Sequence, residues 1–228
     1  KAQRLRPIQR GTFEIQHQAL VIGGGLGGMT AALSIAEQGF PVYLVEREAQ
    51  LGGNLRHIYT GYHGSDPQKL LEETIGQIRD NPRISVLLET EVVEVSGYVG
   101  QYTTQLRSKD GNKSEIQHGV IVVASGGQEI KPSSYGYGEL PGVITQREFE
   151  AIINRQFLRP EITSQTDEAL NEKAVPDLSS PISIVMIQCV GSRDAEHPYC
   201  SRVCCSQALR NALENKKRNP QSSVVILY

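Results

Sequence analysis

Excess charge and long hydrophobic runs are both missing from this sequence, and each absence excludes a class of protein. The 228-residue chain carries 23 Lys and Arg against 25 Asp and Glu, a formal net charge of −2, which argues against nucleic acid or an anionic membrane surface as its partner. No apolar run approaches the roughly 18 residues that a membrane span needs. The basic opening KAQRLRPIQR lacks the apolar core of a secretory signal. With 39% hydrophobic residues, the chain is predicted to be a globular, cytoplasmic protein with a substantial core.

Cysteine is absent everywhere except in one short stretch. Residues 189–205, CVGSRDAEHPYCSRVCC, hold all 4 cysteines. This clustering excludes a disulfide framework spread over the fold. Without an export signal, clustered thiols indicate metal binding or redox work. The chain also opens without Met and stops within the strand-like VVILY, so we expect a piece of a longer protein.

The N-terminal part of the chain predicts a strand–helix–strand unit. Residues 19–24, ALVIGG, are typical of a buried parallel strand, and residues 29–36 repeat apolar side chains at helical spacing. Gly39 and Pro41 end that helix, and 40–46, FPVYLVE, predicts a second strand. A βαβ unit of this size is the building block of doubly wound α/β folds.

Three glycines lie where this unit turns from strand to helix. In a dinucleotide-binding turn, Gly23 permits the tight turn, Gly25 lets the backbone approach a pyrophosphate, and Gly28 lets helix and strand pack closely. Glu46 ends the second strand, where an acid accepts hydrogen bonds from a ribose. A turn that serves packing alone is the alternative, but it does not explain Glu46.

Two further glycine pairs favour FAD over NAD. Gly52-Gly53, in EAQLGGNLR, follows the acid closely, and flavoproteins with two dinucleotide sites often use such a loop beside the FAD pyrophosphate and flavin. The strand-like GVIVVASGG ends in Gly126-Gly127 and is similar to the segment of those proteins that returns beneath the cofactor. A plain turn at the end of a strand is the other interpretation of that second pair.

The rest of the chain predicts more α/β structure. Asp66-Pro67 begins a helix, KDGNK joins two strands of a hairpin, and Thr145 with Glu148 forms a capping-box pattern. The C-terminal part predicts a second βαβ unit. It consists of a strand at ISIVMIQ, a helix over Ser206–Arg218 with apolar Ala208, Leu209, Ala212 and Leu213, and a strand at SVVILY. We therefore expect an N-terminal extension over 1–17, the first segment of a Rossmann-like FAD-binding domain over 18–158, a proline-containing linker over 159–181, and a truncated second Rossmann-like domain with the cysteines over 182–228.

The spacing of the cysteines matches no common metal or redox site. Their function is therefore inferred from where they lie in the predicted strand and helix. Paired C-x2–4-C zinc ligands, the C-x2-C-x2-C of ferredoxins and the C-x-x-C of thioredoxins are all absent. Cys189 ends a predicted strand, and Cys204 and Cys205 lie at the start of a helix, whose dipole stabilises thiolates. No Gly-x-Gly-x-x-Gly is present there, so this second unit is predicted to have exchanged a nucleotide for an iron–sulfur cluster.

Several alternatives stay open at these cysteines. Zinc, a disulfide or redox-active thiols would use the same residues, and adjacent helical residues point about 100° apart, which makes it harder for Cys204 and Cys205 to share one cluster. Arg193 and Arg202 would offset the charge of a cluster or be ordinary surface residues. His197 is a substitute ligand or a surface residue of the loop.

Three segments together closely resemble the A-type subunits of heterodisulfide reductase. They are the glycine turn with VEREAQLGGNLRHI, the stretch VVASGGQEIKPSSYGYGE, and IVMIQCVGSRDAEHPYCSRVCCSQALRNAL, so that the resemblance covers nearly the whole chain from about Gln18. It implies a thioredoxin-reductase-like fold and an electron-transfer protein that depends on FAD and takes part in electron bifurcation. The implied [4Fe–4S] ligands are Cys189, Cys200, Cys204 and Cys205.

The resemblance also implies the residues that contact FAD. These are Gly23, Gly25, Leu26, Gly28, Glu46, Arg47, Gly52, Gly53, Asn54, Val92, Ala124, Ser125 and Gly126. The implied partners are other subunits of a heterodisulfide reductase-like complex, a hydrogenase, formate dehydrogenase or NADH-oxidising module, ferredoxin, and a second copy of the chain. No residue is identified as a general acid or base.

The chain departs from the family pattern in ways that bear on activity. The C-x2-C-x2-C insertion of many members is replaced by the short hairpin SKDGNKS, and their additional cluster domains and second FAD segment are not part of this sequence. We therefore expect the isolated piece to be inactive and able to fold without its cofactor. Two competing functions are a flavin- or NAD-dependent thiol oxidoreductase with Cys204 or Cys205 as nucleophile, and a non-catalytic docking module with a structural metal site.

Overall fold

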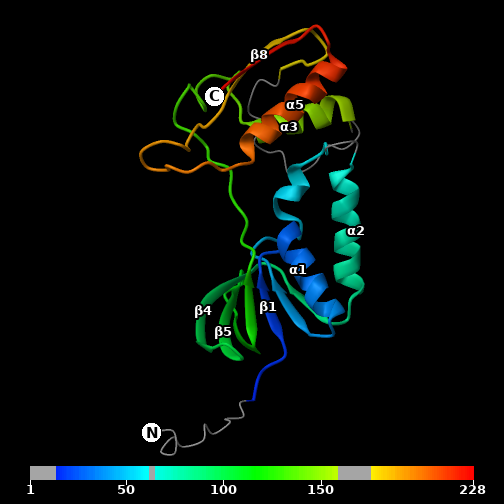
Figure 1. Cartoon of the computed structure of the whole chain (residues 1–228), viewed down its shortest axis with the longest axis vertical. Helices are drawn as coiled ribbons and strands as arrows, with labels where there is room; N and C mark the ends of the chain where they lie inside the picture. The colour runs from blue at the N-terminus through cyan, green and yellow to red at the C-terminus, as the bar shows by residue number, and fades with distance from the viewer. Residues whose placement is uncertain (1–13, 62–64, 159–175) are drawn as a thin grey trace, which may run out of the picture. The chain divides into compact units, whose positions relative to one another are not determined.

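The structure of the chain, a computed structural model, describes residues 14–61, 65–158 and 176–228 (Figure 1). It contains two compact units, one holding residues up to Gly53 together with Glu72–Gly126, the other holding Asn54–Leu71 and Gly127–Tyr228. The helix α2 (Pro67–Asp80) and the 3₁₀ helix η2 (Gly53–His57) cross this division. Of the expected linker 159–181, only the residues from Pro176 onward are described, and the expected extension 1–17 is described only from Glu14.

A parallel sheet of four strands organises the first unit. The strands are β1 (Ala19–Ile22), β2 (Val42–Val45), β3 (Ile84–Leu87) and β7 (Val120–Val123), in the order β3-β2-β1-β7. The helix α1 (Leu26–Glu37) connects β1 to β2, as the sequence predicts (Figure 1). Since the carboxyl ends of parallel strands lie at one edge of a sheet, this order brings the residues after β1, β2 and β7 together.

An antiparallel meander completes the first unit. Its strands are β4 (Thr90–Tyr98), β5 (Gln101–Ser108) and β6 (Lys113–His118), and the predicted KDGNK turn joins the last two. The ladder shifts register between Val92 and Glu94, where a bulge lies in β4. Buried Leu20, Val45 and Leu106 pack together, so one core joins the meander to the parallel sheet.

The second unit contains the second βαβ motif that the sequence predicts. β8 (Ser183–Ile187) and β9 (Ser223–Leu227) pair in parallel, and α5 (Cys204–Arg218) connects them. The helix α3 (Gln146–Ile153), continued by the π-helical turn η4 (Asn154–Leu158), packs beside α5 (Figure 1). The core between them is formed by Phe149, Ala151, Ile152, Ile153, Leu178, Met186, Ala208 and Ala212. Leu178 is fully buried, so the end of the expected linker belongs to this core.

Side chains cap two of the helices as the sequence predicts. The Thr145 hydroxyl accepts a hydrogen bond from the Glu148 N–H (3.2 Å), and the Glu148 carboxylate accepts one from the Thr145 N–H (2.7 Å). Asp66 accepts hydrogen bonds from the N–H groups of Gln68 (2.9 Å) and Lys69 (3.1 Å) at the start of α2. Each cap satisfies amides that have no partner within the helix.

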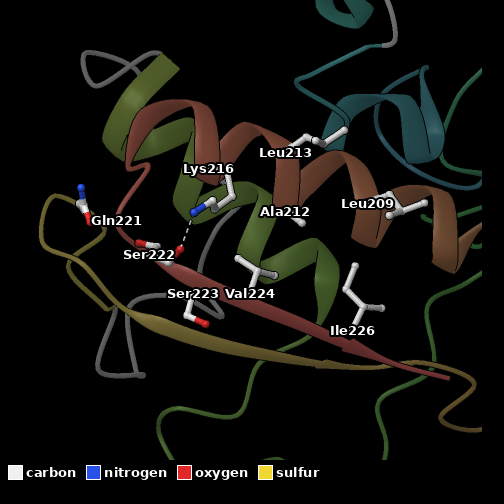
Figure 2. Close-up of a pocket in the computed structure, with 9 residues that line it drawn as sticks. All are labelled: Leu209, Ala212, Leu213, Lys216, Gln221, Ser222, Ser223, Val224 and Ile226. Atoms are coloured by element: carbon white, nitrogen blue, oxygen red, sulfur yellow. Dashed lines mark hydrogen bonds between the residues drawn. The ribbon is translucent and has the colours of Figure 1, made fainter.

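The predicted apolar face of α5 is partly wrong. Ala208 and Ala212 are buried, but Leu209 and Leu213 are 53% and 68% exposed, and Asn211 is buried in their place. The alanines allow α5 to approach α3 closely, and the leucines line an open groove beside β9 with Lys216, Gln221, Ser222, Ser223, Val224 and Ile226 (Figure 2). No described helix has both the length and the apolar character needed to cross a bilayer.

Candidate functional site

The turn between β1 and α1 is so tightly packed that a side chain at either of two glycines would collide with backbone atoms. Gly23 has a positive φ of 110°, and a Cβ there would lie 2.3 Å from the carbonyl oxygen of Ala124. A Cβ on Gly28 would lie 1.8 Å from the carbonyl oxygen of Gly23. Gly23 therefore allows the turn to approach the end of β7, and Gly28 allows α1 to approach the turn.

Gly25 differs from these two because space is open beside it. Apart from atoms of their own chain neighbours and of the helix backbone, no atom of the described residues lies within 4 Å of a Cβ built on Gly25 or on Gly27. Gly25 is also the N-cap of α1, where no side chain caps the helix and no acidic residue lies in the first turn. The first helical bond runs from Met29 N–H to the Gly25 carbonyl (2.9 Å), so the amides of the first turn remain available to an anion. Leu26, the first helical residue, is 36% exposed.

Glu46 supports the glycine turn, a role that the sequence pattern does not reveal. Its side chain is buried, and its carboxylate accepts hydrogen bonds from the N–H groups of Gly24 (2.6 Å) and Glu48 (2.9 Å). Each oxygen uses one lone pair in these bonds and keeps a second. Arg47 points into solvent and forms an ion pair with Glu48 (3.2 Å).

The second glycine pair lies directly against the first glycine turn. The Gly52 N–H donates to the Gly24 carbonyl (2.8 Å), and Gly25 and Gly52 form a parallel β-bridge. Gly53 has a φ of 49°, and a Cβ there would lie 3.2 Å from the Cα of Gly25. Glycine adopts this conformation without strain and adds no side chain at the close approach, so the two loops lie in direct contact.

The remaining residues of the predicted FAD set have different surroundings. Val92 is half-buried and packs against the core between the two sheets. The Ala124 N–H donates to the Ile22 carbonyl (2.8 Å), while Ser125 and Gly126 are exposed beyond β7. In the second unit, the Asn54 side-chain amide donates to the Gly127 carbonyl (2.7 Å).

The cysteine loop after β8 has an unusual backbone. Cys189, Arg193 and Arg202 have φ values of 60°, 59° and 63°, in the left-handed region that non-glycine residues seldom adopt. The Arg193 N–H donates to the Tyr199 carbonyl (3.2 Å), which fixes the loop in this form. Backbone strain of this kind concentrates at functional sites and persists only where the surroundings enforce it.

Hydrogen-bond donors surround the sulfur atoms of the loop. Arg193 Nη1 lies 3.8 Å from Cys189 Sγ, the Arg202 N–H lies 3.3 Å from Cys200 Sγ, and the Ser201 hydroxyl lies 3.4 Å from Cys204 Sγ. Arg193 thus contacts a cysteine through its guanidinium group, whereas Arg202 uses its backbone. Donors of this kind stabilise thiolates and the negative charge of a cluster.

His197 contributes to the structure of the loop. Its ring packs edge-on against Tyr199, and its Nδ1 lies 3.7 Å from an oxygen of Asp194. The same Asp194 oxygen accepts hydrogen bonds from the N–H groups of Glu196 (3.0 Å) and His197 (2.6 Å). These contacts hold His197 in the loop.

The two adjacent cysteines at the start of α5 differ in acidity. Burial opposes ionisation of Cys204, but hydrogen bonds from Ser201, Cys205 and the backbone of Cys189 and Cys205 outweigh it and lower the pKa of this thiol. The pKa of Cys205 is raised by burial and by the negative charge of Cys204, with smaller contributions from Cys189 and Cys200. The fold therefore places Cys205 within electrostatic range of the other three cysteines.

The four thiols are of the kind that bind iron–sulfur clusters, but they are not arranged to bind a single metal ion. Across the described ranges, no group of three or more His, Cys, Asp or Glu side chains converges to hold one metal ion. Four thiolates with N–H and guanidinium donors around them are the donor set that a [4Fe–4S] cluster uses. A cluster of four irons is larger than one ion, so its ligands need not converge on one point.

The parallel sheet has a glycine turn at the edge where its strands end, an uncapped helix start and a carboxylate after β2. Together these features define a dinucleotide-binding Rossmann-type protein. Residues 17–186 match the profile of the pyridine nucleotide-disulphide oxidoreductases. The chain belongs to that family.

Curated relatives match the whole chain, and one solved structure has a similar fold. The chain is 26% identical over 320 aligned positions to an A-type iron-sulfur subunit of the CoB–CoM heterodisulfide reductase of Methanopyrus kandleri, with 100% of this chain and 46% of the relative covered. It is 25% identical to the A-type subunit of the H2/formate:CoB–CoM heterodisulfide,ferredoxin reductase of Methanococcus maripaludis, with the same coverage. L-proline dehydrogenase from P. horikoshii has a similar fold, with a TM-score of 0.50, 19% identity, and 92% of this chain and 35% of that chain covered.

The alignment lengths carry a further fact about the chain. It spans less than half the length of these curated relatives. The first alignment has 320 positions for a chain of 228 residues, so the relative has at least 92 residues (320 minus 228) within the aligned region that this chain lacks.

Proposed function

We propose that the chain is the FAD-binding, electron-transfer portion of a heterodisulfide reductase-like subunit. The observation that carries the proposal is the contrast between Gly28 and Gly25. Packing alone explains why Gly28 has no side chain, because a Cβ would lie 1.8 Å from a backbone oxygen. On the Cβ side of Gly25, however, no described residue beyond its chain neighbours lies within 4 Å. A ligand that approaches the backbone supplies the missing reason.

The proposed FAD site consists of the backbone of the two glycine loops and the carboxylate of Glu46. The pyrophosphate would lie at the amides that begin α1, with Gly23, Gly25, Leu26 and Gly28 around it, and Glu46 would accept hydrogen bonds from the ribose. Gly52, Gly53 and Asn54 would border the flavin, with Arg47, Val92, Ala124, Ser125 and Gly126 completing the set. Bound FAD supplies the chemistry of accepting two electrons and releasing them singly.

The proposed cluster site uses the four cysteines of the loop after β8. Cys189, Cys200, Cys204 and Cys205 would each supply one thiolate to a [4Fe–4S] cluster. The positive end of α5 and the Arg193 guanidinium group would favour the charged form of these ligands.

The names of the relatives extend the proposal to partners. One names hydrogen or formate, a heterodisulfide and ferredoxin, which fits a bifurcating protein that divides electrons between two acceptors. We propose that the longer protein works in such a complex in the cytoplasm, with a hydrogenase, formate dehydrogenase or NADH-oxidising module as electron donor.

A second candidate function, a thiol oxidoreductase, has one observation in its favour. The pKa of Cys204 is lowered and that of Cys205 is raised, which is the asymmetry that a nucleophilic thiol beside a resolving thiol needs. In this alternative Cys204 would attack the substrate disulfide and release one substrate thiolate, and Cys205 would resolve the mixed disulfide and release the second. A reduced flavin would supply the two electrons that return the Cys204–Cys205 disulfide to thiols.

Anaerobic reconstitution with FAD, iron and sulfide separates the two functions. The proposed function predicts flavin absorption together with four irons per chain and an EPR signal on reduction. A thiol oxidoreductase would bind flavin without iron. A chain that binds neither would contradict both, and a cluster that no redox partner reduces would support a docking module with a structural metal site.

A further inference from the structure

A buried carboxylate joins three segments of the second unit. Glu150 of α3 is 1% exposed. Its Oε1 accepts a hydrogen bond from the Tyr59 N–H (2.9 Å), and its Oε2 accepts hydrogen bonds from Arg210 Nη2 (2.8 Å) and Gln207 Nε2 (3.2 Å). We call these four residues the Glu150 junction.

A contribution to the stability of the fold does not by itself explain why these charged side chains are buried here. The Arg210 side chain is only 14% exposed, and its Nε is buried without a hydrogen-bond partner. Removing two charges from water is costly, and apolar side chains of similar volume often serve as well or better in such a place. A buried pair does, however, hold its partners in one defined geometry, because each departure leaves a charge unpaired.

The donors on one side belong to the helix that carries the cysteines. Gln207 lies in the first turn of α5, three residues after Cys204, and its N–H donates to the Val203 carbonyl (3.0 Å). Arg210 lies one turn further along the same helix face. Glu150 therefore holds the first two turns of α5 through two side chains.

The donor on the other side follows the second glycine pair. Tyr59 lies just beyond η2, whose first residue is Gly53. Gln68 Nε2 holds the same segment through the carbonyls of Leu55 (3.1 Å) and Ile58 (2.7 Å). Residues 54–59 are thus fixed at several points, and Glu150 is the one contact among these that connects them to α5.

We infer that Glu150 is a positioning residue that couples residues 54–59 to the start of α5. A displacement at the cysteine loop is then transmitted to the residues after Gly52-Gly53, and the coupling acts equally in the other direction. The inference rests on the proposed function in one respect, because that function places FAD beside residues 54–59 and an iron–sulfur cluster beside the start of α5.

Hydrogen exchange at the Tyr59 amide tests the coupling in the unloaded whole chain. In Glu150→Gln, we expect this amide to exchange at least about tenfold faster, because the neutral side chain cannot accept from all three donors. The reaction rates of Cys204 and Cys205 with a thiol reagent should change in the same variant. The matched control Glu214→Gln breaks another Glu–Arg pair of α5, with Arg218 (2.9 Å), and should change neither rate. An unchanged Tyr59 rate in folded Glu150→Gln overturns the inference.

A double variant separates positioning from stability and covers the case in which Glu150→Gln does not fold. Glu150→Met with Arg210→Met replaces both charges by side chains of similar volume, so the fold should be retained. The Tyr59 amide should still exchange faster than in the wild type. Retained protection in this variant would show that the junction does not hold residues 54–59.

Iron-loaded protein provides the functional readout. At equal iron content, the EPR spectrum of the double variant should differ from that of the wild type, and an identical spectrum overturns the part of the inference that concerns α5. If the wild-type chain binds no iron, the proposed function fails, but the exchange and thiol rates still decide the coupling.

Discussion

At the scale of single residues, the glycines of the β1–α1 turn serve two different purposes. Gly23 and Gly28 are required by packing, whereas Gly25 has free space beside it. The sequence pattern assigns each of the three a different role by its position, and the neighbouring backbone atoms show at which positions packing alone requires glycine. Substitution by alanine therefore has different consequences at Gly28 and at Gly25.

We expect Gly28→Ala to lower the free energy of unfolding by about 3 kcal/mol, because the added methyl group meets the Gly23 carbonyl. Gly25→Ala should change it by less than about 1 kcal/mol but weaken FAD binding at least about tenfold. Urea unfolding and flavin titration measure the two quantities. Gly76→Ala, in the open interior of α2, is the control and should stabilise by about 0.5–1 kcal/mol. Equal stability losses at residues 25 and 28 would contradict this distinction.

His118 is a residue whose role belongs to the meander rather than to the site. It is fully buried, stacks on Tyr102, and its Nε2 lies 2.7 Å from the Thr104 hydroxyl. Its Nδ1 lies 3.2 Å from the Val120 carbonyl, which can only accept, so Nδ1 carries the proton and Nε2 accepts from Thr104. Burial lowers the pKa of His118, although the hydrogen bond to Val120 acts in the opposite direction.

A lowered pKa of His118 predicts loss of stability in acid. The unfolded chain protonates this side chain near its ordinary pKa of 6.5, before the folded chain does, so the free energy of unfolding decreases as pH falls below that value. The slope due to one such group is at most about 1.4 kcal/mol per pH unit. Urea unfolding from pH 7.5 to 5 should show the decrease, and His118→Gln should reduce it. A decrease of the same size in the variant would assign the effect to other groups.

At the scale of the elements, local signals define where the helices begin. The capping box of Thr145 and Glu148 and the cap at Asp66 are present as the sequence predicts. These caps are predictable because the atoms that form each cap lie within four residues of chain. Their formation therefore does not depend on how distant elements pack.

The α3 cap should account for a measurable part of the stability of the second unit. We expect Thr145→Ala to lower the free energy of unfolding by about 1 kcal/mol, because the Glu148 N–H loses its acceptor. Thr145→Ser keeps the acceptor and should retain most of that stability. Guanidinium unfolding of the three proteins checks the expectation, which fails if Ser and Ala destabilise equally.

Helix α5 shows what local patterns cannot decide. Its leucines have the spacing of a buried face, yet Leu209 and Leu213 are exposed while Asn211 and Asn215 are buried. The Asn211 side-chain amide donates to Gln146 of α3, at its carbonyl (3.0 Å) and its side-chain oxygen (2.9 Å). The position of α3 therefore decides which face of α5 is covered.

At the scale of the whole molecule, the proposed FAD and cluster residues fall largely in different compact units. The glycine turn and Glu46 belong to the first unit, and the cysteine loop belongs to the second. Each unit has its own core, so each site should be built by its own unit.

Loss of one cofactor should therefore leave the other in place. We expect Cys200→Ser to reduce the iron content of reconstituted protein while the FAD content stays near that of the wild type. Gly25→Ala should have the reverse effect. Flavin absorbance and iron analysis of the same samples measure both quantities. Simultaneous loss of flavin and iron in Cys200→Ser would show that the two sites depend on each other.

The sequence by itself determined the βαβ units, the glycine turn, the helix caps and the family resemblance. Each of these depends on residues close together in the chain, such as Gly23 to Gly28 or Thr145 to Glu148, and their spacing is fixed by backbone geometry. The expected domain boundaries and the ligand roles of the site residues stay predictions.

Only the tertiary structure decided the other features. It placed the Glu46 carboxylate on the Gly24 amide, buried Leu178 within the expected linker, exposed Leu209 and Leu213, and brought Glu150 to Tyr59 and Arg210. Each of these depends on contacts between residues far apart in the chain. Such contacts form only when whole elements pack, and burial then depends on the neighbouring element rather than on the residue type.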